Sequence, residues 1–70
     1  MREKKEVTVN GERCFFAEDA TLLDVVRSLS LEPDRVAVEL NRAIVKREAW
    51  PATRFAANAE IEIVQFVGGG

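Results

Sequence analysis

Apolar and polar residues alternate near the start of the chain, and this pattern predicts a β-hairpin over residues 5–17. Val7 and Val9 have polar neighbours, and Asn10-Gly11 separates their run from the next one. Asn and Gly both tolerate the positive φ of a two-residue type I′ turn, so this turn fixes the register. The expected facing pairs are Val9 with Glu12, Val7 with Cys14 and Lys5 with Phe16. The predicted core face of the hairpin consists of Val7, Val9, Cys14 and Phe16, because opposite residues share a face.

A helical pattern follows over residues 21–30. Thr21 suits the N-cap, and Asp24 stands three residues later, which is the spacing of a capping box. The apolar residues recur at i, i+3, i+4 and i+7 and form one stripe that we expect the helix to bury against the sheet: Leu22, Val25, Val26 and Leu29. The segment 30–34 contains Pro33 and is expected to be the loop that leaves the helix.

Two further strands are predicted over residues 35–46, joined at Asn41-Arg42. This turn is weaker than Asn-Gly, because Arg is less comfortable than Gly at positive φ. Residues 47–50 favour a single helical turn that ends before Pro51, and Trp50 is expected to cap a satellite cluster with Phe55.

The strongest strand pattern in the chain, EIEIVQFV, covers residues 60–67. The resulting order is two strands, a helix, two strands, a helical turn and a last strand. This order predicts an α+β fold with a mixed four- to five-stranded sheet and one main helix packed across one face. If the first and last strands lie parallel at the sheet centre, the fold is the ubiquitin-like β-grasp. Residues 1–67 then form one β-grasp domain, and 68–70 form a flexible glycine tail.

Composition excludes several classes of protein. The chain has 70 residues, no histidine, a single cysteine and a net charge of −2. A zinc site, a disulfide framework and a histidine-dependent nucleophile are therefore excluded, and a nucleic-acid partner is not expected. No phosphate-binding glycine motif, membrane-spanning run or apolar signal segment is present in the sequence. We expect a cytoplasmic monomer that is not an enzyme, with no bound cofactor and no membrane partner.

Three glycines, Gly68, Gly69 and Gly70, end the sequence and need an explanation. A frayed end or a cloning linker is one alternative. The other is functional, because a segment without side chains can enter a narrow channel and bring an ionised terminal carboxylate to a reactive centre. That carboxylate can attack the α-phosphate of ATP, which makes an acyl-adenylate on Gly70. A partner enzyme must then supply the ATP and the metal.

The chain resembles the ThiS family, the sulfur carriers of thiamine biosynthesis, over about residues 7–70. The resemblance rests on VNGE at 9–12, ATLLDVV at 20–26, VAVELN at 36–41, IVKREAW at 44–50, IEIV at 61–64 and FVGGG at 66–70. It implies that a ThiF-type enzyme adenylates Gly70 with ATP and Mg. Sulfur from a cysteine desulfurase then gives a thiocarboxylate, which donates its sulfur to thiazole synthase. The sequence departs from the family pattern in the Asn41-Arg42 turn, at Asn58-Ala59 and at Lys46, which leaves the loop details open.

Other functions remain open at this point. The small subunit of molybdopterin synthase and a ubiquitin-like modifier share the glycine ending. A non-covalent β-grasp binding module, in which the glycines are incidental, belongs to a different class.

Side-chain alternation also predicts a partner surface on the face of the sheet that the helix leaves uncovered. Its predicted residues are Val64, Phe66, Glu39 and Glu62, and partial burial of Phe66 at a sheet edge is the alternative. Cys14 is interpreted as a small core residue rather than a sulfur relay. Lys4-Lys5 is interpreted as a charge pair on an edge strand or at the terminus.

Overall fold

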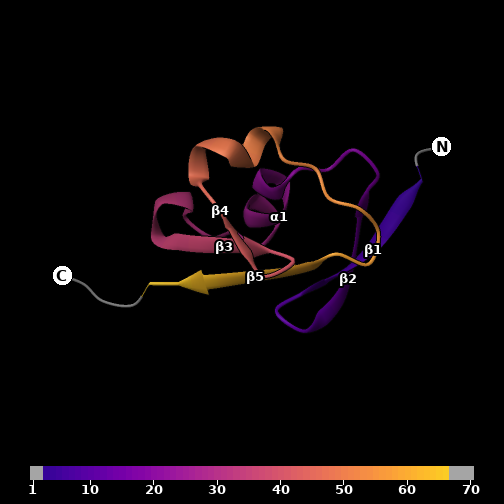
Figure 1. Cartoon of the computed structure of the whole chain (residues 1–70), viewed down its shortest axis with the longest axis horizontal. Coiled ribbons are helices and arrows are strands. Elements are labelled where there is room, and N and C mark those ends of the chain that lie inside the picture. Colours follow the sequence, from indigo (N-terminus) through magenta and orange to yellow (C-terminus); the bar gives the residue numbers. More distant parts are fainter. Residues whose placement is uncertain (1–2, 67–70) are drawn as a thin grey trace.

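The computed structural model describes residues 3–66 and contains a sheet of five strands with one α-helix. The elements are β1 (Lys4–Val9), β2 (Glu12–Ala17), α1 (Leu22–Ser28), η1 (Pro33–Arg35), β3 (Val36–Leu40), β4 (Ala43–Val45), η2 (Arg47–Ala52) and β5 (Glu60–Gln65). The strand order is β2-β1-β5-β3-β4, and β1 pairs with β5 in parallel while the other pairs are antiparallel. The predicted mixed sheet with parallel first and last strands in its interior is confirmed (Figure 1).

Local sequence explains both hairpins. The register Val9↔Glu12, Val7↔Cys14 and Lys5↔Phe16 is the one that the Asn10-Gly11 turn predicts. The second hairpin turns at Asn41 and Arg42, with φ values of 51° and 72°. Arg42 therefore occupies the left-handed region, which is strained for a residue with a Cβ.

The helix begins as predicted and ends earlier. Thr21 and Asp24 form a complete capping box, in which each side chain accepts a hydrogen bond from the backbone N–H of the other residue. The helix ends at Ser28 because Ser30 adopts φ 58° and the Ser30 N–H donates to the Arg27 carbonyl at 3.0 Å. Leu29 lies beyond the last turn and is exposed, so its assignment to the buried stripe was wrong.

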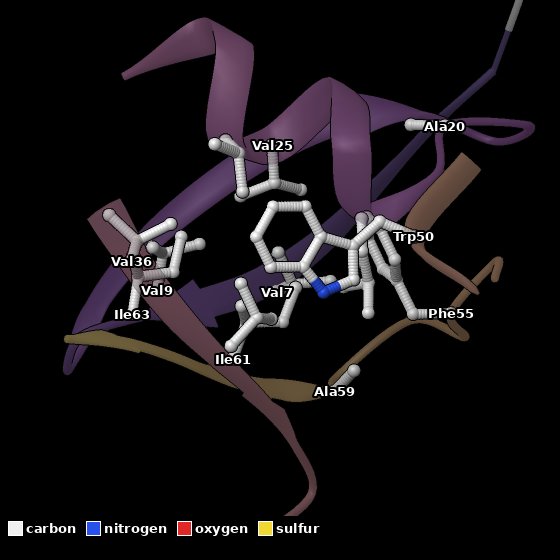
Figure 2. Packing of buried hydrophobic residues seen from close by; sticks show 13 residues of the cluster. Val7, Val9, Ala20, Val25, Val36, Trp50, Phe55, Ala59, Ile61 and Ile63 are labelled. Carbon is white, nitrogen blue, oxygen red and sulfur yellow. The ribbon is translucent and has the colours of Figure 1, made fainter. Parts of the chain in front are cut away.

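The core lies between the sheet and α1, with η2 on the same side of the sheet (Figure 1). Trp50 is fully buried among residues of the helix and the strands (Figure 2). Its indole N–H donates to the Val45 carbonyl at 2.9 Å, which satisfies the polar end of the ring. The prediction of a satellite cluster was wrong, because Trp50 and Phe55 belong to the main core. Pro51 lies inside η2, so the helical segment does not stop before it.

Lys5 differs most from its predicted role. It lies on an interior strand and is only 2% exposed, so it is not a terminal or edge charge. Its Nζ donates to the carbonyl oxygens of Phe55 at 2.6 Å, Glu18 at 2.9 Å and Ala20 at 3.4 Å. The same atom lies 3.9 Å from the centroid of the Phe55 ring, and that ring packs edge-on against Phe16. The buried ammonium therefore joins β1 to two distant loops through backbone acceptors and an aromatic face.

Candidate functional site

The glycine tail lies beyond the residues that the structure describes. Val67, Gly68, Gly69 and Gly70 lie outside residues 3–66, so the predicted modification of Gly70 remains a prediction. The last described element before the tail is β5, and the structure shows how this strand is held. Phe66 follows β5 directly, and its N–H donates to the Arg35 carbonyl at 2.8 Å.

Two asparagines fix β5 from opposite sides. Asn10, in the first hairpin turn, accepts from the Ile63 N–H at 2.7 Å and donates from Nδ2 to the Ile63 carbonyl at 3.2 Å. Asn41, in the second hairpin turn, accepts from the Glu60 N–H at 2.9 Å, and its own N–H donates to the Glu60 carbonyl at 2.7 Å. Both residues have positive φ, which directs each amide toward β5. The Asn10 amide continues the pairing of β5 beyond the end of β1, so the strand stays bonded on that side up to Ile63.

The face of the sheet opposite the helix carries an apolar patch close to the end of β5. Val64 is 55% exposed and Phe66 is 58% exposed, so the alternative of partial burial for Phe66 is wrong. Ile44 on β4 is 74% exposed and extends this surface. The sequence analysis missed Ile44, although the register of the Asn41-Arg42 turn places it opposite Glu39 and therefore on the open face. We call Ile44, Val64 and Phe66 the open-face patch.

Two carboxylates lie beside the open-face patch. Glu39 on β3 and Glu62 on β5 stand directly opposite each other on antiparallel strands, and Ile44 is the other neighbour of Glu39. Within residues 3–66 neither carboxylate forms an ion pair. Like charges in directly opposite positions destabilise a sheet. A basic group on a partner surface would relieve this repulsion. The structure therefore brings all four predicted interface residues together on one face.

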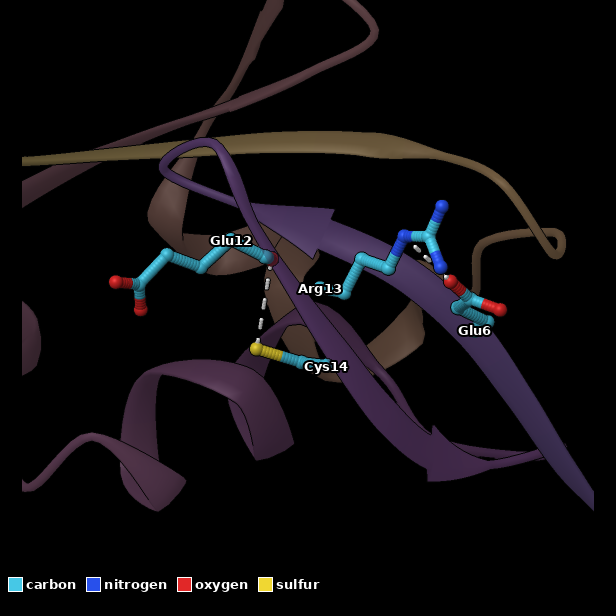
Figure 3. A network of polar contacts seen from close by, with 4 residues as sticks. All are labelled: Glu6, Glu12, Arg13 and Cys14. Carbon is cyan, nitrogen blue, oxygen red and sulfur yellow. Dashed lines mark hydrogen bonds and ion pairs between the residues drawn. The ribbon is translucent and has the colours of Figure 1, made fainter.

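Cys14 makes packing contacts. It is half-buried and packs against the core, and its Sγ lies 3.7 Å from the Glu12 carbonyl (Figure 3). Arg13 belongs to the opposite face, where its Nε lies 3.1 Å from the Glu6 carboxylate. The interpretation of Cys14 as a small packing residue agrees with these contacts.

We searched residues 3–66 for pockets, metal-ligand groups and membrane-spanning helices. A shallow hollow of about 190 Å³ lies at the junction of β1 and β5 and is lined by Thr8, Gly11, Glu60, Ile61 and Glu62. No group of three His, Cys, Asp or Glu side chains in this part of the chain could hold a metal ion. No helix within the same residues has the length and apolar character needed to cross a membrane.

Comparison with known proteins gives consistent results. Residues 2–70 match the model of the ThiS family. The chain is 36% identical to the sulfur carrier protein ThiS of Bacillus subtilis, and the match covers 89% of this chain and 96% of that protein. It superposes on a crystal structure of the thiamine biosynthesis protein ThiS from Geobacter metallireducens with a TM-score of 0.78 and 32% identity, over 93% of this chain and 99% of that one.

A second group of relatives is much longer. The chain is 35% identical to a thiazole synthase of Magnetococcus marinus, and the match covers 93% of this chain. The chain spans only 20% of that protein and 20% of a similar thiazole synthase from Paramagnetospirillum magneticum. A region similar to this chain therefore occurs within larger proteins that are named for thiazole synthesis.

Proposed function

The chain belongs to the ThiS family, and on that premise we propose that it is a sulfur carrier of thiamine biosynthesis whose Gly70 carboxylate is converted to a thiocarboxylate. A ThiF-type enzyme first adenylates this carboxylate with ATP and Mg. A persulfide formed by a cysteine desulfurase displaces AMP and gives an acyl disulfide on Gly70. A second thiol then reduces this disulfide, which releases the thiocarboxylate, and thiazole synthase receives the sulfur. The carrier is a protein substrate in these steps, and the enzymes supply the catalytic groups.

The observation that carries this proposal is the combination of a glycine ending with a firmly held last strand. Glycines present no side chain to a narrow channel. β5 lies between two neighbouring strands and is bonded on both sides by asparagine side chains. A partner that binds the sheet therefore receives the tail from a defined position.

We further propose that the open-face patch, with Glu39 and Glu62, docks on the activating enzyme. Exposed apolar side chains beside two carboxylates that form no ion pair within residues 3–66 fit an apolar surface that carries a basic group. Binding would then remove apolar surface from water and also relieve the repulsion between Glu39 and Glu62.

Thiazole synthase is proposed as the protein that receives the sulfur. Two relatives with this name contain a region similar to nearly the whole of this chain. Such an arrangement is expected if the carrier domain and the synthase act together.

The first experiment weighs the protein. The intact mass of the protein isolated from cells tests whether Gly70 is its last residue. Incubation with the activating enzyme, ATP and a sulfur donor is expected to raise that mass by the difference between one sulfur and one oxygen atom. Deleting Gly69-Gly70 should abolish this gain while Trp50 fluorescence shows an unchanged fold. A non-covalent binding module would gain no mass, and a modifier would appear attached to other proteins.

The second experiment tests the docking surface. Val64→Asp and Phe66→Asp are expected to weaken binding to the activating enzyme in a calorimetric titration without lowering thermal stability. Phe15→Asp is the matched control, because Phe15 is equally exposed on the distant strand β2. Equal affinity for all three variants and the unmodified protein would refute the proposed surface.

A further inference from the structure

The strand β2 forms one edge of the sheet and carries an exposed aromatic residue that lies outside the proposed docking surface. Phe15 is 62% exposed, and it is separated from β5 by the whole of β1. Within residues 3–66 the outer side of β2 has no neighbouring strand. The opposite edge strand, β4, has only three residues, whereas β2 has six.

The register shows which backbone groups of β2 point away from β1. Val9 and Glu12 flank a two-residue turn and form a hydrogen-bonded pair, and such pairs recur at every second residue of an antiparallel ladder. Cys14 and Phe16 therefore direct their N–H and C=O groups toward β1. Arg13 and Phe15 direct theirs outward. The next outward carbonyl, that of Ala17, already accepts from the Ala20 N–H at 3.0 Å.

We propose that β2 pairs with β2 of a second copy of this chain, antiparallel and centred on Cys14. In this register the N–H and C=O groups of Arg13 meet those of Phe15 in the other copy, and symmetry repeats the pair. All four outward groups of Arg13 and Phe15 on each chain are then bonded. Shifting the centre to Phe15 instead requires the occupied Ala17 carbonyl and places Glu12 opposite Glu18, which is a like-charge pair.

Side chains favour the same register. On the open face, Arg13 of each copy lies beside Phe15 of the other, so two exposed aromatic rings each gain a guanidinium neighbour. On the helix face, the two Cys14 residues stand opposite each other in a non-hydrogen-bonded position. Opposite Cα atoms in such positions are about 4.5 Å apart, which lies within the range of a disulfide.

The association leaves the carrier function available. β1 separates β5 from β2 in both copies, and the open-face patch lies on β5, β4 and Phe66, away from the paired edge. A short strand pairing buries little surface, so the dimer is weak and forms at high protein concentration. The expected monomer then describes the dilute protein.

Sedimentation equilibrium tests the association on the full chain, kept reduced, from about 10 μM to about 1 mM. The average mass is expected to rise toward twice the monomer mass. Phe15→Arg should prevent this rise, because it places arginines opposite each other. Adding Arg13→Glu to Phe15→Arg should restore it, because each glutamate then faces an arginine of the other copy. Ile44→Arg, on the other edge strand, is the control and should associate like the unmodified protein.

Diamide oxidation tests the register. Diamide takes two electrons and two protons from two thiols, and the expected product is one disulfide between the two Cys14 residues. Cross-linking should rise with concentration and fall in Phe15→Arg. A constant monomer mass up to about 1 mM refutes the dimer. Failure of the double variant to associate, or dimers without Cys14 cross-links, refutes this register. The average mass of the protein could stay at the monomer value while Phe15→Arg weakens binding to another protein. In that case the outer edge of β2 binds that other protein, and the proposal is wrong.

Discussion

Replacing Lys5 by methionine is expected to destabilise the protein more than any other single change of charge. The ammonium group of Lys5 reaches three carbonyl oxygens and the face of Phe55 from a position that is almost closed to water. Methionine has a similar length and fills the same space, but it donates no hydrogen bond. The acceptors are backbone carbonyls, so they stay in place when the side chain changes.

The magnitude follows from what is lost and what is regained. A buried acceptor left without a donor costs about 1–3 kcal/mol, and the carbonyls of Phe55 and Ala20 are buried while that of Glu18 is only partly so. The contact with the Phe55 ring adds about 1–2 kcal/mol. Relief from burying a charge returns part of this sum. We expect a net loss of about 2–4 kcal/mol, out of a total of about 4–10 kcal/mol for a domain of this size.

Urea unfolding measures this loss through Trp50, the only tryptophan in the sequence and a fully buried one. Lys5→Met should lower the urea concentration at the unfolding midpoint in proportion to the lost free energy of unfolding. The dependence of that free energy on urea concentration should not change, which would show that Lys5→Met and the unmodified protein expose similar surface on unfolding. Lys4→Met is the matched control, since Lys4 is exposed on the same strand, and its stability should change by less than about 0.5 kcal/mol. A Lys5→Met protein as stable as the unmodified one would refute the reasoning, because the carbonyls would then not need a donor.

Three further single substitutions are expected to change the free energy of unfolding by smaller amounts, and urea unfolding measures each change. Arg42→Gly should raise stability by about 0.5–1 kcal/mol, because glycine removes the strain at positive φ while the ion pair to Glu60 is exposed and weak; a loss of stability would contradict this. Thr21→Ala should lower stability by about 1 kcal/mol through loss of the N-cap, and an unchanged midpoint would show that the capping box contributes nothing. Asn10→Ala should cost about 1–2 kcal/mol and increase amide exchange at Ile63, whose N–H loses its acceptor; unaltered exchange at this amide would contradict the assigned bond.

Most of the fold follows from short-range sequence rules, because the decisive turns carry their own signals. Asn10-Gly11 fixes the first register, and Thr21 with Asp24 fixes the start of α1. The side-chain alternation of β5 also predicts which residues are exposed, and Val64 and Phe66 follow it. Each of these features depends on residues within a few positions of one another.

The features that the sequence analysis missed depend on distant parts of the chain. The predicted register already placed Lys5 opposite Phe16 on the core face, but its charge favoured an exposed position. Burial is possible only because the carbonyl of Phe55, 50 residues away, accepts its hydrogen bond. Trp50 joins the main core for a similar reason, since η2 packs against α1, which lies much earlier in the chain. Such contacts cannot be read from local patterns.

The position of the open-face patch limits how a partner can use the tail. Phe66 is the last described residue, and Gly70 stands four positions after it. A fully extended chain spans at most about 3.6 Å per residue, so Gly70 cannot lie more than about 14 Å from Phe66. An activating enzyme that binds Phe66 must therefore hold its reactive phosphate within that distance of its docking surface. Because Phe66 and the tail both follow β5 in the sequence, the proposed docking contact also sets the reach of the proposed reacting group. A docking surface placed farther from the reactive centre would bind the folded domain and leave the carboxylate unmodified.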